Sequence, residues 1–461
     1  EDKAAILEAH RAENIYYRGY YFMRFLLTLA IAIALPFSAS ALSIGEAISL
    51  TLENDDAVKQ YRSLAESQRY SRNASLALFL PSLDLEYQGV FTKLNHDNNT
   101  AVDGTDSDSG QLAASLGYNI FNGFADVYSV RMSMRAYDVQ LLQYDAKKQD
   151  TIMNVKNAYI NYLMAKDAVD IANETLKLLE MQRNTADISY QIGTLARTDV
   201  LQVEVQLAAS KLELLNAQRA FKLAGKQLEK YIGRVLGEDE VVEDLTLGEY
   251  EIPPINDLYG YLESRRSEMI MVKKSEEAAT MGARRSLSSF IPRVDAFANY
   301  TFYSDTYSPM NGRDGTTAGD YDSALSIGVR ATWNIFQGFS SYNTYRSQAK
   351  SAMAAAYTVS DTRSSLRLAL DDAYESYFTA RELLSVAEVG LAQAEENYRV
   401  TKIQYDNSQA TTTDLLNANV ALNKARTALT AARYGIIAAV ATLERAVEMD
   451  FLKIKYADPD A

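Results

Sequence analysis

The sequence contains no cysteine, which excludes disulfides and thiolate metal sites. It has only two histidines, His10 and His96, so catalytic triads and multi-histidine metal sites lack their residues. Positive charge is also scarce: 46 Lys and Arg face 60 Asp and Glu, for a net charge of −14. Because phosphate binding needs a basic face, this balance argues against a nucleic-acid partner. We therefore expect neither an enzyme nor a nucleic-acid-binding protein, and we expect no cofactor or metal.

Long hydrophobic runs are scarce as well. One apolar run at 25–35 follows a short basic start and precedes small residues at 39–41, which predicts a Sec-type signal peptide over 23–41. An N-terminal membrane anchor is the alternative, but the run is short for a span. Residues 1–22 form an upstream extension that we do not expect in the mature protein. No later stretch reaches the ~18 apolar residues of a membrane helix, so entry into a membrane would need a β-barrel.

The main feature that is present is an internal duplication. The segment Asn-Ile-Phe-Asn-Gly-Phe at 119–124 recurs as Asn-Ile-Phe-Gln-Gly-Phe at 334–339, which is 215 positions later. The same offset maps the Ala-Tyr-x-x-Tyr segment at 158–162 onto the one at 373–377. A repeat this long is a duplicated domain half rather than a solenoid unit. It favours a function that uses symmetry, such as a ring or a tube.

The duplication sets the expected organisation of the chain. Each half reads as a helical segment, two strands, a very long helix, a tight turn and a second long helix. The expected parts are a first repeat at 42–236, an acidic and proline-containing linker at 237–257, a second repeat at 258–450 and a short tail at 451–461. We expect the linker and the tail to be peripheral and to pack beside the helices.

The predicted strands alternate apolar and polar residues. In the second half the apolar positions are Leu325, Ile327, Val329, Ala331 and Trp333, and the first half shows the same alternation at 83–87 and 112–120. Long polar loops at 93–110 and 304–320 join the strands of each half. A period of two over about ten residues is typical of a transmembrane strand. A soluble sheet with one solvated face gives the same alternation, and the strands alone do not separate the two.

The predicted long helices carry a seven-residue repeat. Residues 125–187 contain neither proline nor glycine, which at 1.5 Å per residue predicts a rod of roughly 90 Å. The repeat in the second half runs through Leu370, Tyr377, Leu384, Leu391, Tyr398 and Tyr405. Such spacing indicates left-handed supercoiling. A second apolar stripe on the first long helix favours a curved wall of helices over an ordinary antiparallel coiled coil.

The strand count points to an oligomer if the strands lie in a membrane. Two strand pairs give four strands per chain, whereas the smallest membrane barrels have about eight. An open sheet edge is not tolerated in lipid, so several chains must contribute. Two copies would close a barrel filled by side chains, and three copies would close a twelve-stranded barrel with a lumen.

At this point the sequence resembles the TolC family of outer-membrane efflux proteins over residues 42–450. The resemblance rests on the strand entries at Pro81 and Pro292, the two Asn-Ile-Phe segments, the Ala-Tyr-x-x-Tyr segments and the tip segments at 190–200 and 405–415. It implies a mixed α/β membrane protein, in which a trimeric twelve-stranded transmembrane β-barrel with four strands per chain continues into a long periplasmic α-helical barrel.

The resemblance also implies a function and partners. A homotrimer in the outer membrane of a Gram-negative bacterium would be a passive export duct that contacts outer-membrane lipid. It would dock with a periplasmic adaptor (membrane fusion) protein and an inner-membrane pump, and export small toxic compounds or proteins. Two alternatives stay open: a type I protein secretion duct rather than drug efflux, and, in a different class, a coiled-coil envelope or adhesin protein without a pore.

The family's gate lies at the periplasmic tips of the helical hairpins. Carried over to this sequence, Asp199 and Tyr405 are candidates for a hydrogen bond between hairpins, and Asp414 for an acidic ring. A second acidic position of the family falls on Asn417 here, and a tip arginine falls on Ala410. Arg197 is a possible substitute donor.

Helix capping is the alternative role for both aspartates. Asp199-x-x-Gln202 and Thr411-x-x-Asp414 each fit a capping box, and a cap can also face a lumen.

Two further surfaces follow from the resemblance. The turns between the long helices should face the adaptor, through Gly193, Thr194, Leu195, Ser408 and Gln409. Aromatic residues near the strand ends suit an interfacial belt, with ordinary strand packing as the alternative: Trp333, Tyr118, Tyr300 and Tyr303.

Overall fold

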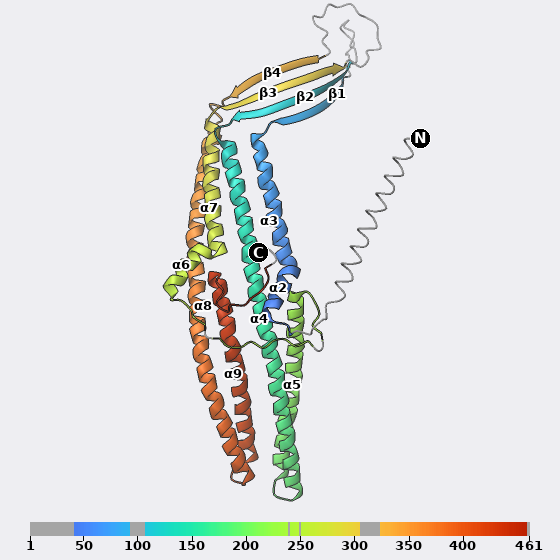
Figure 1. Ribbon diagram of the computed structural model, residues 1–461, viewed down its shortest axis with the longest axis vertical. Coiled ribbons are helices and arrows are strands. Elements are labelled where there is room, and N and C mark those ends of the chain that lie inside the picture. The colour runs from blue at the N-terminus through green and yellow to red at the C-terminus, as the bar shows by residue number, and fades with distance from the viewer. Residues whose placement is uncertain (1–40, 93–106, 238–239, 249, 305–322, 459–461) are drawn as a thin grey trace, which may run out of the picture.

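The computed structural model of the chain describes residues 41–92, 107–237, 240–248, 250–304 and 323–458 (Figure 1). The predicted upstream extension and nearly all of the predicted signal peptide lie outside these residues, as do most of the two polar loops. Within the described ranges, every helix is too short or too polar to serve as a membrane span.

The two halves of the chain have the same element order, which confirms the predicted duplication. The first half comprises α2 (Ile44–Asn54), α3 (Asp56–Ser75), η1 (Leu76–Phe79), β1 (Ser82–Thr92), β2 (Ser107–Phe121), α4 (Ala125–Gln191) and α5 (Arg197–Ile232). The second comprises α6 (Ile255–Arg265), α7 (Ser267–Ser286), η2 (Leu287–Phe290), β3 (Arg293–Ser304), β4 (Ser323–Thr332), α8 (Ser340–Asp406) and α9 (Thr412–Val447). Both α4 and α8 have 67 residues, and both α5 and α9 have 36.

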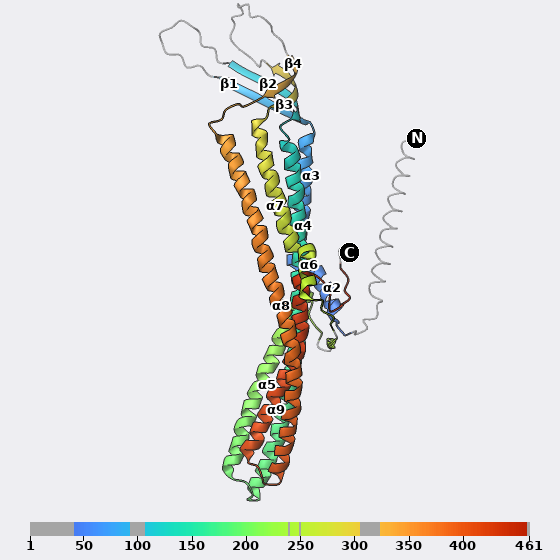
Figure 2. The same ribbon diagram turned by 90° about the vertical axis from the view of Figure 1, so that its left-hand side faces the viewer.

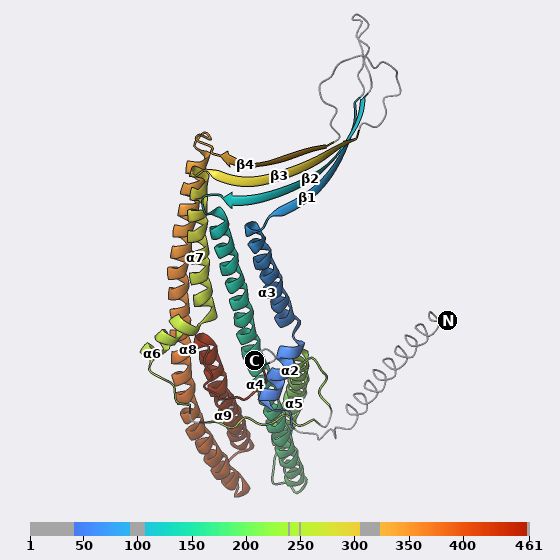
Figure 3. The same cartoon turned by 45° about the horizontal axis from the view of Figure 1, so that its top comes forward.

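The sheet lies at one end of an elongated molecule, and the helices run from it toward two hairpin tips at the other end (Figures 1 and 2). The strand order is β1-β2-β3-β4, and every neighbouring pair is antiparallel. Among the described residues, β1 and β4 therefore each have one unpaired edge. Figure 3 shows the sheet as one curved layer above the helices.

One face of this sheet is apolar and exposed. The register places Leu83 opposite Leu116, Leu116 opposite Ala298, and Ala298 opposite Ile327. Leu83 is 75% exposed and Ile327 is 76% exposed. The neighbouring row on the opposite face is polar and joins Asp84, Ser115, Asn299 and Ser326. A continuous apolar face of this kind needs a cover of lipid or protein.

The Asn-Ile-Phe segments are the turns by which a strand enters a long helix. Gly123 and Phe124 have φ angles of +65° and +66°, and Gly338 and Phe339 repeat them at +58° and +62°. A Cβ on Gly123 would lie 3.0 Å from the Ser288 Cα atom, so any side chain would be strained at this positive φ. The Phe124 ring packs edge to face on Phe121, with 5.4 Å between centroids. The repeated motif therefore encodes a two-residue left-handed turn.

The largest apolar core lies at mid-height, where α2, α4, α5 and α9 meet the chain at 240–248. The Leu42 amide donates to the Val241 carbonyl over 2.8 Å. The Tyr159 hydroxyl on α4 lies 2.8 Å from the Leu42 carbonyl oxygen and 2.7 Å from that of Glu243. These contacts place part of the predicted linker beside the helices. The described residues of the C-terminal segment contribute Leu452, Ile454 and Tyr456 to the same core.

Candidate functional site

Helices α4 and α5 form the first hairpin, and α8 and α9 form the second. The turns at the tips of the two hairpins have the same geometry. Gly193 and Ser408 both adopt a left-handed conformation, with φ angles of +80° and +61°. The Thr194 amide donates to the Ser189 carbonyl over 2.9 Å, and the Gln409 amide donates to the Gln404 carbonyl over 2.7 Å. The backbone of the second turn thus matches the first although it lacks the glycine. Leu195, the other residue of the predicted docking set, follows Thr194 in the first turn. Docking of an adaptor at these turns stays a prediction.

The two hairpins contact each other near their tips. Ala186, Val200 and Val203 form a buried apolar cluster in the first hairpin, and Leu416 of the second hairpin packs against it. The Thr413 hydroxyl on α9 also donates to Gln202 Oε1 on α5, over 3.1 Å. Sequence reasoning missed this hydrogen bond. Gln202 was considered only as a capping partner, and nothing local to Thr413 indicates a contact with the other hairpin.

Asp199 does not begin its helix, so its predicted role as an N-cap residue is wrong. Helix α5 begins at Arg197, and its N-cap residue is Ala196, which makes no side-chain cap. Asp199 is the third residue of the helix, and its amide donates to the Ala196 carbonyl over 3.2 Å. A carboxylate in the first turn still interacts favourably with the helix dipole, by ~0.3–1 kcal/mol.

The predicted hydrogen bond between Asp199 and Tyr405 is not formed among the described residues of the single chain. Tyr405 instead lines a cavity between the hairpins. The Arg197 guanidinium lies 5.6 Å from the centre of the Tyr190 ring in its own hairpin. Both gate roles therefore remain predictions that concern the assembled protein.

Asp414 has the capping role that was considered for it. Thr411 is the N-cap residue of α9, and the capping box is complete. The Thr411 amide donates to Asp414 Oδ2 over 2.9 Å, and the Asp414 amide donates to the Thr411 hydroxyl over 3.2 Å. Hydrogen bonds from Thr411, first from its hydroxyl and then from its amide, lower the pKa of the Asp414 carboxyl. The exposed side chain therefore stays anionic at the tip, and exposed Asn417 follows three residues later.

Polar contacts continue between the hairpins along the shaft. The Thr175 hydroxyl on α4 lies 2.8 Å from Asn423 Oδ1 on α9, and Arg426 forms an ion pair with Glu174 at 2.9 Å. These contacts hold α4 against α9 within one chain. They involve ordinary polar residues on long helices, so no sequence signal marks them.

The predicted aromatic belt is exposed where its side chains are described. Trp333 follows β4, is 58% exposed and donates its indole N–H to the Phe290 carbonyl over 3.2 Å. Tyr118 and Tyr300 lie on the apolar face of the sheet and are also exposed. Tyr303 pairs with Gln111 through the backbone, and its side chain lies outside the described part of the chain. A role at a membrane interface stays a prediction.

Comparison with known proteins gives matches over most of the chain. The family model described as outer membrane efflux protein matches residues 47–234 and 258–447. Outer membrane protein TolC of Escherichia coli K12 is 20% identical over 373 residues, which are 79% of this chain and 74% of that protein. The alkaline protease secretion protein AprF of Pseudomonas aeruginosa is 22% identical over 429 residues, which are 90% of this chain and 86% of that protein.

The fold also matches solved structures. The outer membrane protein VceC of Vibrio cholerae aligns with a TM-score of 0.75 at 17% identity, covering 88% of this chain and 96% of VceC. The four-stranded sheet and the long helical hairpins are therefore the fold of outer-membrane channel proteins.

Proposed function

We propose that this chain, which belongs to the outer membrane efflux protein family, forms the outer-membrane duct of a three-part export system. Three copies form a tube in which the sheets make a barrel in the membrane and the hairpins make a helical barrel in the periplasm. Cargo passes through the tube passively, and a pump in the inner membrane supplies the energy.

The observation that carries this proposal is the exposed apolar face of a sheet with two free edges. Lipid covers such a face without cost, but lipid offers no hydrogen-bond partners for the edges of β1 and β4. A neighbouring copy satisfies them when its β4 pairs with β1. Four strands per copy make twelve in three copies, and a barrel of that size leaves a lumen.

The polar row at Asp84, Ser115, Asn299 and Ser326 then faces the lumen, while Leu83 and Ile327 face lipid. The experiment that tests the assembly is native mass spectrometry of the protein extracted from the outer membrane in detergent. Particles of three chains support the proposal. Particles that contain one or two chains contradict it.

The gate of the duct is proposed at the hairpin tips. In the closed trimer Asp199 and Tyr405 hold neighbouring hairpins together, and Arg197 adds a donor. Three copies of Asp414 form an acidic ring, with Asn417 one helical turn further along the lumen. Hydrogen bonds from Thr411 lower the pKa of Asp414 in the single chain, which supports an anionic side chain at the tip. In a ring, repulsion between the three carboxylates acts in the opposite direction and favours a bound cation.

Ion selectivity tests the acidic ring. Asp414→Ala should reduce the preference of the pore for cations, whereas Asp406→Ala, on the preceding helix, should leave it unchanged. If Asp414→Ala has the selectivity of the wild type, Asp414 is only a helix cap.

Opening requires partners that bind the tips. We place a periplasmic adaptor protein at the turns of Gly193, Thr194, Leu195, Ser408 and Gln409, which lie at the free ends of the hairpins (Figure 2). Photo-crosslinkers at Thr194 and Gln409 should capture the adaptor in cells, and a crosslinker at exposed Gln393, 13 residues before the end of α8, should not.

Protein secretion is a second candidate for the cargo. The similarity to AprF extends over 90% of this chain, against 79% for Escherichia coli TolC. AprF is named for the secretion of a protease, which favours a polypeptide among the molecules exported by this chain. Loss of a secreted protein from the medium of a deletion strain, with unchanged drug sensitivity, would select this candidate over drug efflux. The match to outer-membrane channels supports both drug efflux and protein secretion over a coiled-coil adhesin without a pore.

A further inference from the structure

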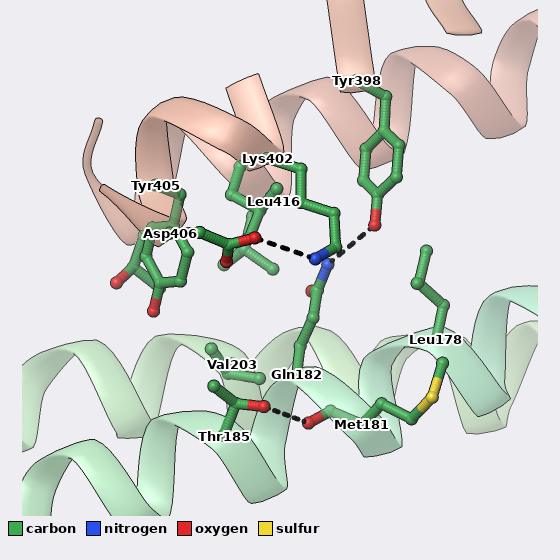
Figure 4. A pocket seen from close by; sticks show the side chains of 12 residues that line it. Leu178, Met181, Gln182, Thr185, Val203, Tyr398, Lys402, Tyr405, Asp406 and Leu416 are labelled. Carbon is green, nitrogen blue, oxygen red and sulfur yellow. Dashed lines mark hydrogen bonds and ion pairs between the residues drawn. The ribbon is translucent and has the colours of Figure 1, made fainter. Parts of the chain in front are cut away.

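A cavity of about 260 Å³ lies between the two hairpins of one chain, close to their tips. Helices from both hairpins form its walls, and Figure 4 shows their side chains converging on it. Met181 and Gln182 come from α4, Tyr398 and Tyr405 from α8, and Thr412 from α9. Because all of these residues belong to one chain, the cavity does not depend on a neighbouring copy.

The cavity wall has the chemistry of a small-molecule site. Its apolar part includes the thioether of Met181, and two tyrosine rings flank the cavity. Thioethers and aromatic rings both pack well on flat aromatic molecules. The charged residues in the wall, Lys402 and Asp406, pair with each other at 3.1 Å, which leaves no net charge for a ligand to match.

Two oxygens in the wall lack hydrogen-bond partners. Gln182 Oε1 and Thr412 Oγ1 are both buried and unpaired among the described residues. Thr412 as a residue is 4% exposed. Most buried polar groups in proteins are hydrogen-bonded, so such groups call for a physical explanation. A ligand that donates a hydrogen bond would supply the missing partner.

Both oxygens are covered, but Gln182 as a residue is only half-buried, whereas Thr412 is buried. Its amide nitrogen makes a single contact, at 3.5 Å from the Tyr398 hydroxyl, which is long for a hydrogen bond. Neighbouring atoms cover the oxygen in this orientation, so binding of a donor requires the amide to turn about its terminal bond. Little holds the amide in its present orientation.

We propose that this cavity binds a small, uncharged, planar aromatic molecule that donates one hydrogen bond to Gln182. The volume is just below the ~300–1,000 Å³ of sites for drug-sized ligands, so one or two fused rings fit. A bound molecule keeps α4 and α8 apart at the tip and opposes movement of one hairpin against the other. That consequence for the gate rests on the proposed function, whereas the binding itself does not.

Methyl NMR of the protein labelled with ¹³C-methyl methionine tests the site directly. The probes are 1-naphthol and 1-methoxynaphthalene, which share a ring system but differ in the hydrogen-bond donor. The Met181 methyl lies in the cavity wall, while Met134 and Met353 are exposed elsewhere and act as internal controls. Met181→Leu assigns the reporting signal. We expect 1-naphthol to shift the Met181 signal to saturation and to bind about tenfold more tightly than 1-methoxynaphthalene.

Two variants identify the hydrogen bond and the cavity. Gln182→Met keeps the length of the side chain and should abolish the preference for 1-naphthol, whereas Gln393→Met, on the exposed shaft of α8, should retain it. Leu178→Trp, which fills the cavity from its wall, should abolish the Met181 shift in a protein that still forms its native assembly. A shift at Met181 that does not saturate, equal shifts at all three methionines, or an unchanged preference in Gln182→Met would overturn the proposal.

Conductance of the same preparation separates this inference from the proposed function. A protein that conducts while Met181 fails to respond contradicts the ligand site alone. A protein that binds 1-naphthol but forms no pore contradicts the duct alone.

Discussion

The ammonium group of Lys156 on α4 lies 2.5 Å from the carboxylate of Glu444 on α9, and each side chain is only 6% exposed. Glu444 Oε1 also accepts hydrogen bonds from the amides of Phe451 and Leu452, at 2.7 and 2.6 Å. One buried carboxylate thus joins a helix of each hairpin to the C-terminal segment. The cost of burying each charge is offset only while both partners are present.

Removal of one partner should therefore destabilise the fold strongly. We expect Lys156→Met to lower the free energy of unfolding by ~3–5 kcal/mol, because Glu444 is left buried without a counter-ion. Lys156→Met combined with Glu444→Gln should recover part of this loss, since the side-chain carbonyl of Gln can still accept a hydrogen bond from a backbone amide of the C-terminal segment. Urea unfolding in detergent measures the free energy of unfolding of the single and double variants. If the loss in the double variant equals the sum of the losses in the two single variants, the coupling between Lys156 and Glu444 is contradicted.

The loss in Lys156→Met should also depend on pH. Burial is the largest influence on the Glu444 carboxyl and raises its pKa, while Lys156 acts in the opposite direction. Without Lys156 the pKa rises further. The destabilisation should shrink as the pH falls, because a protonated Glu444 needs no counter-ion.

The Tyr434 hydroxyl gives a second pH dependence. It lies 3.2 Å from Asp167 Oδ2 and 3.2 Å from Asp244 Oδ1, although one hydroxyl can donate only one hydrogen. Burial, followed by repulsion from Asp244, raises the pKa of Asp167 above its ordinary value of 3.8, although the Tyr434 hydrogen bond opposes this. The folded chain then binds a proton more tightly than the unfolded chain. The stabilisation that protonated Asp167 contributes to the fold is fully present below pH 3.8, and it is lost as the pH rises through the pKa of Asp167 in the folded chain.

Asp167→Asn should accordingly raise the melting temperature near neutral pH. The Asn side chain still accepts from Tyr434 and can donate to Asp244, so the cluster keeps its hydrogen bonds without the charge. The gain should shrink as the pH falls toward 4. Glu180→Gln, on the exposed surface of the same helix and outside this cluster, is the control and should show little change. A lower melting temperature for Asp167→Asn at pH 7 would refute this account of the cluster.

The hairpin turns predict opposite effects for two reciprocal substitutions. Ser408 adopts a φ of +61°, which costs roughly 1 kcal/mol for a residue with a Cβ. Ser408→Gly should remove most of this cost, whereas Gly193→Ser should introduce it at a φ of +80°. No atom lies within 4 Å of a Cβ built on Gly193, so backbone strain alone is measured there. Amide hydrogen exchange at the tips should slow in the first variant and accelerate in the second.

The two faces of β4 should respond differently to a charge. Ile327→Lys places an ammonium on the apolar face, which should cost ~2–4 kcal/mol near the centre of a bilayer. Ser326→Lys, at the next residue, places it on the polar face and should be tolerated. Unfolding by urea in lipid vesicles gives the two free energies. Equal losses would contradict the assignment of the apolar face to lipid.

The sequence predicts the scaffold well because its signals are periodic. The heptad spacing through Leu370 and Tyr377 and the alternation through Leu325 and Ile327 depend only on which face of the element is apolar, and both patterns recur in the two halves. The repeated Asn-Ile-Phe segments are visible in the sequence. The φ angles of Phe124 and Phe339 are not, because phenylalanine rarely adopts this conformation.

The site was harder to predict because its contacts join distant parts of the chain. Asp199-x-x-Gln202 fits a capping pattern, yet the helix begins two residues earlier and Gln202 binds Thr413 of the other hairpin. Nothing near Lys156 in the sequence indicates its pairing with Glu444, which is 288 residues away. The cavity likewise arises from the packing of two hairpins, and its residues follow no common motif.

Single-channel conductance in planar bilayers tests the central claim most directly. The wild-type protein should form pores of low conductance, because the proposed gate closes the tips. Asp199→Ala combined with Tyr405→Phe should raise the conductance severalfold, whereas Glu396→Gln on the exposed shaft of α8 should leave it unchanged. Protein that inserts into the bilayer without conducting in any variant would contradict the duct, and a double variant with the wild-type conductance would contradict the gate.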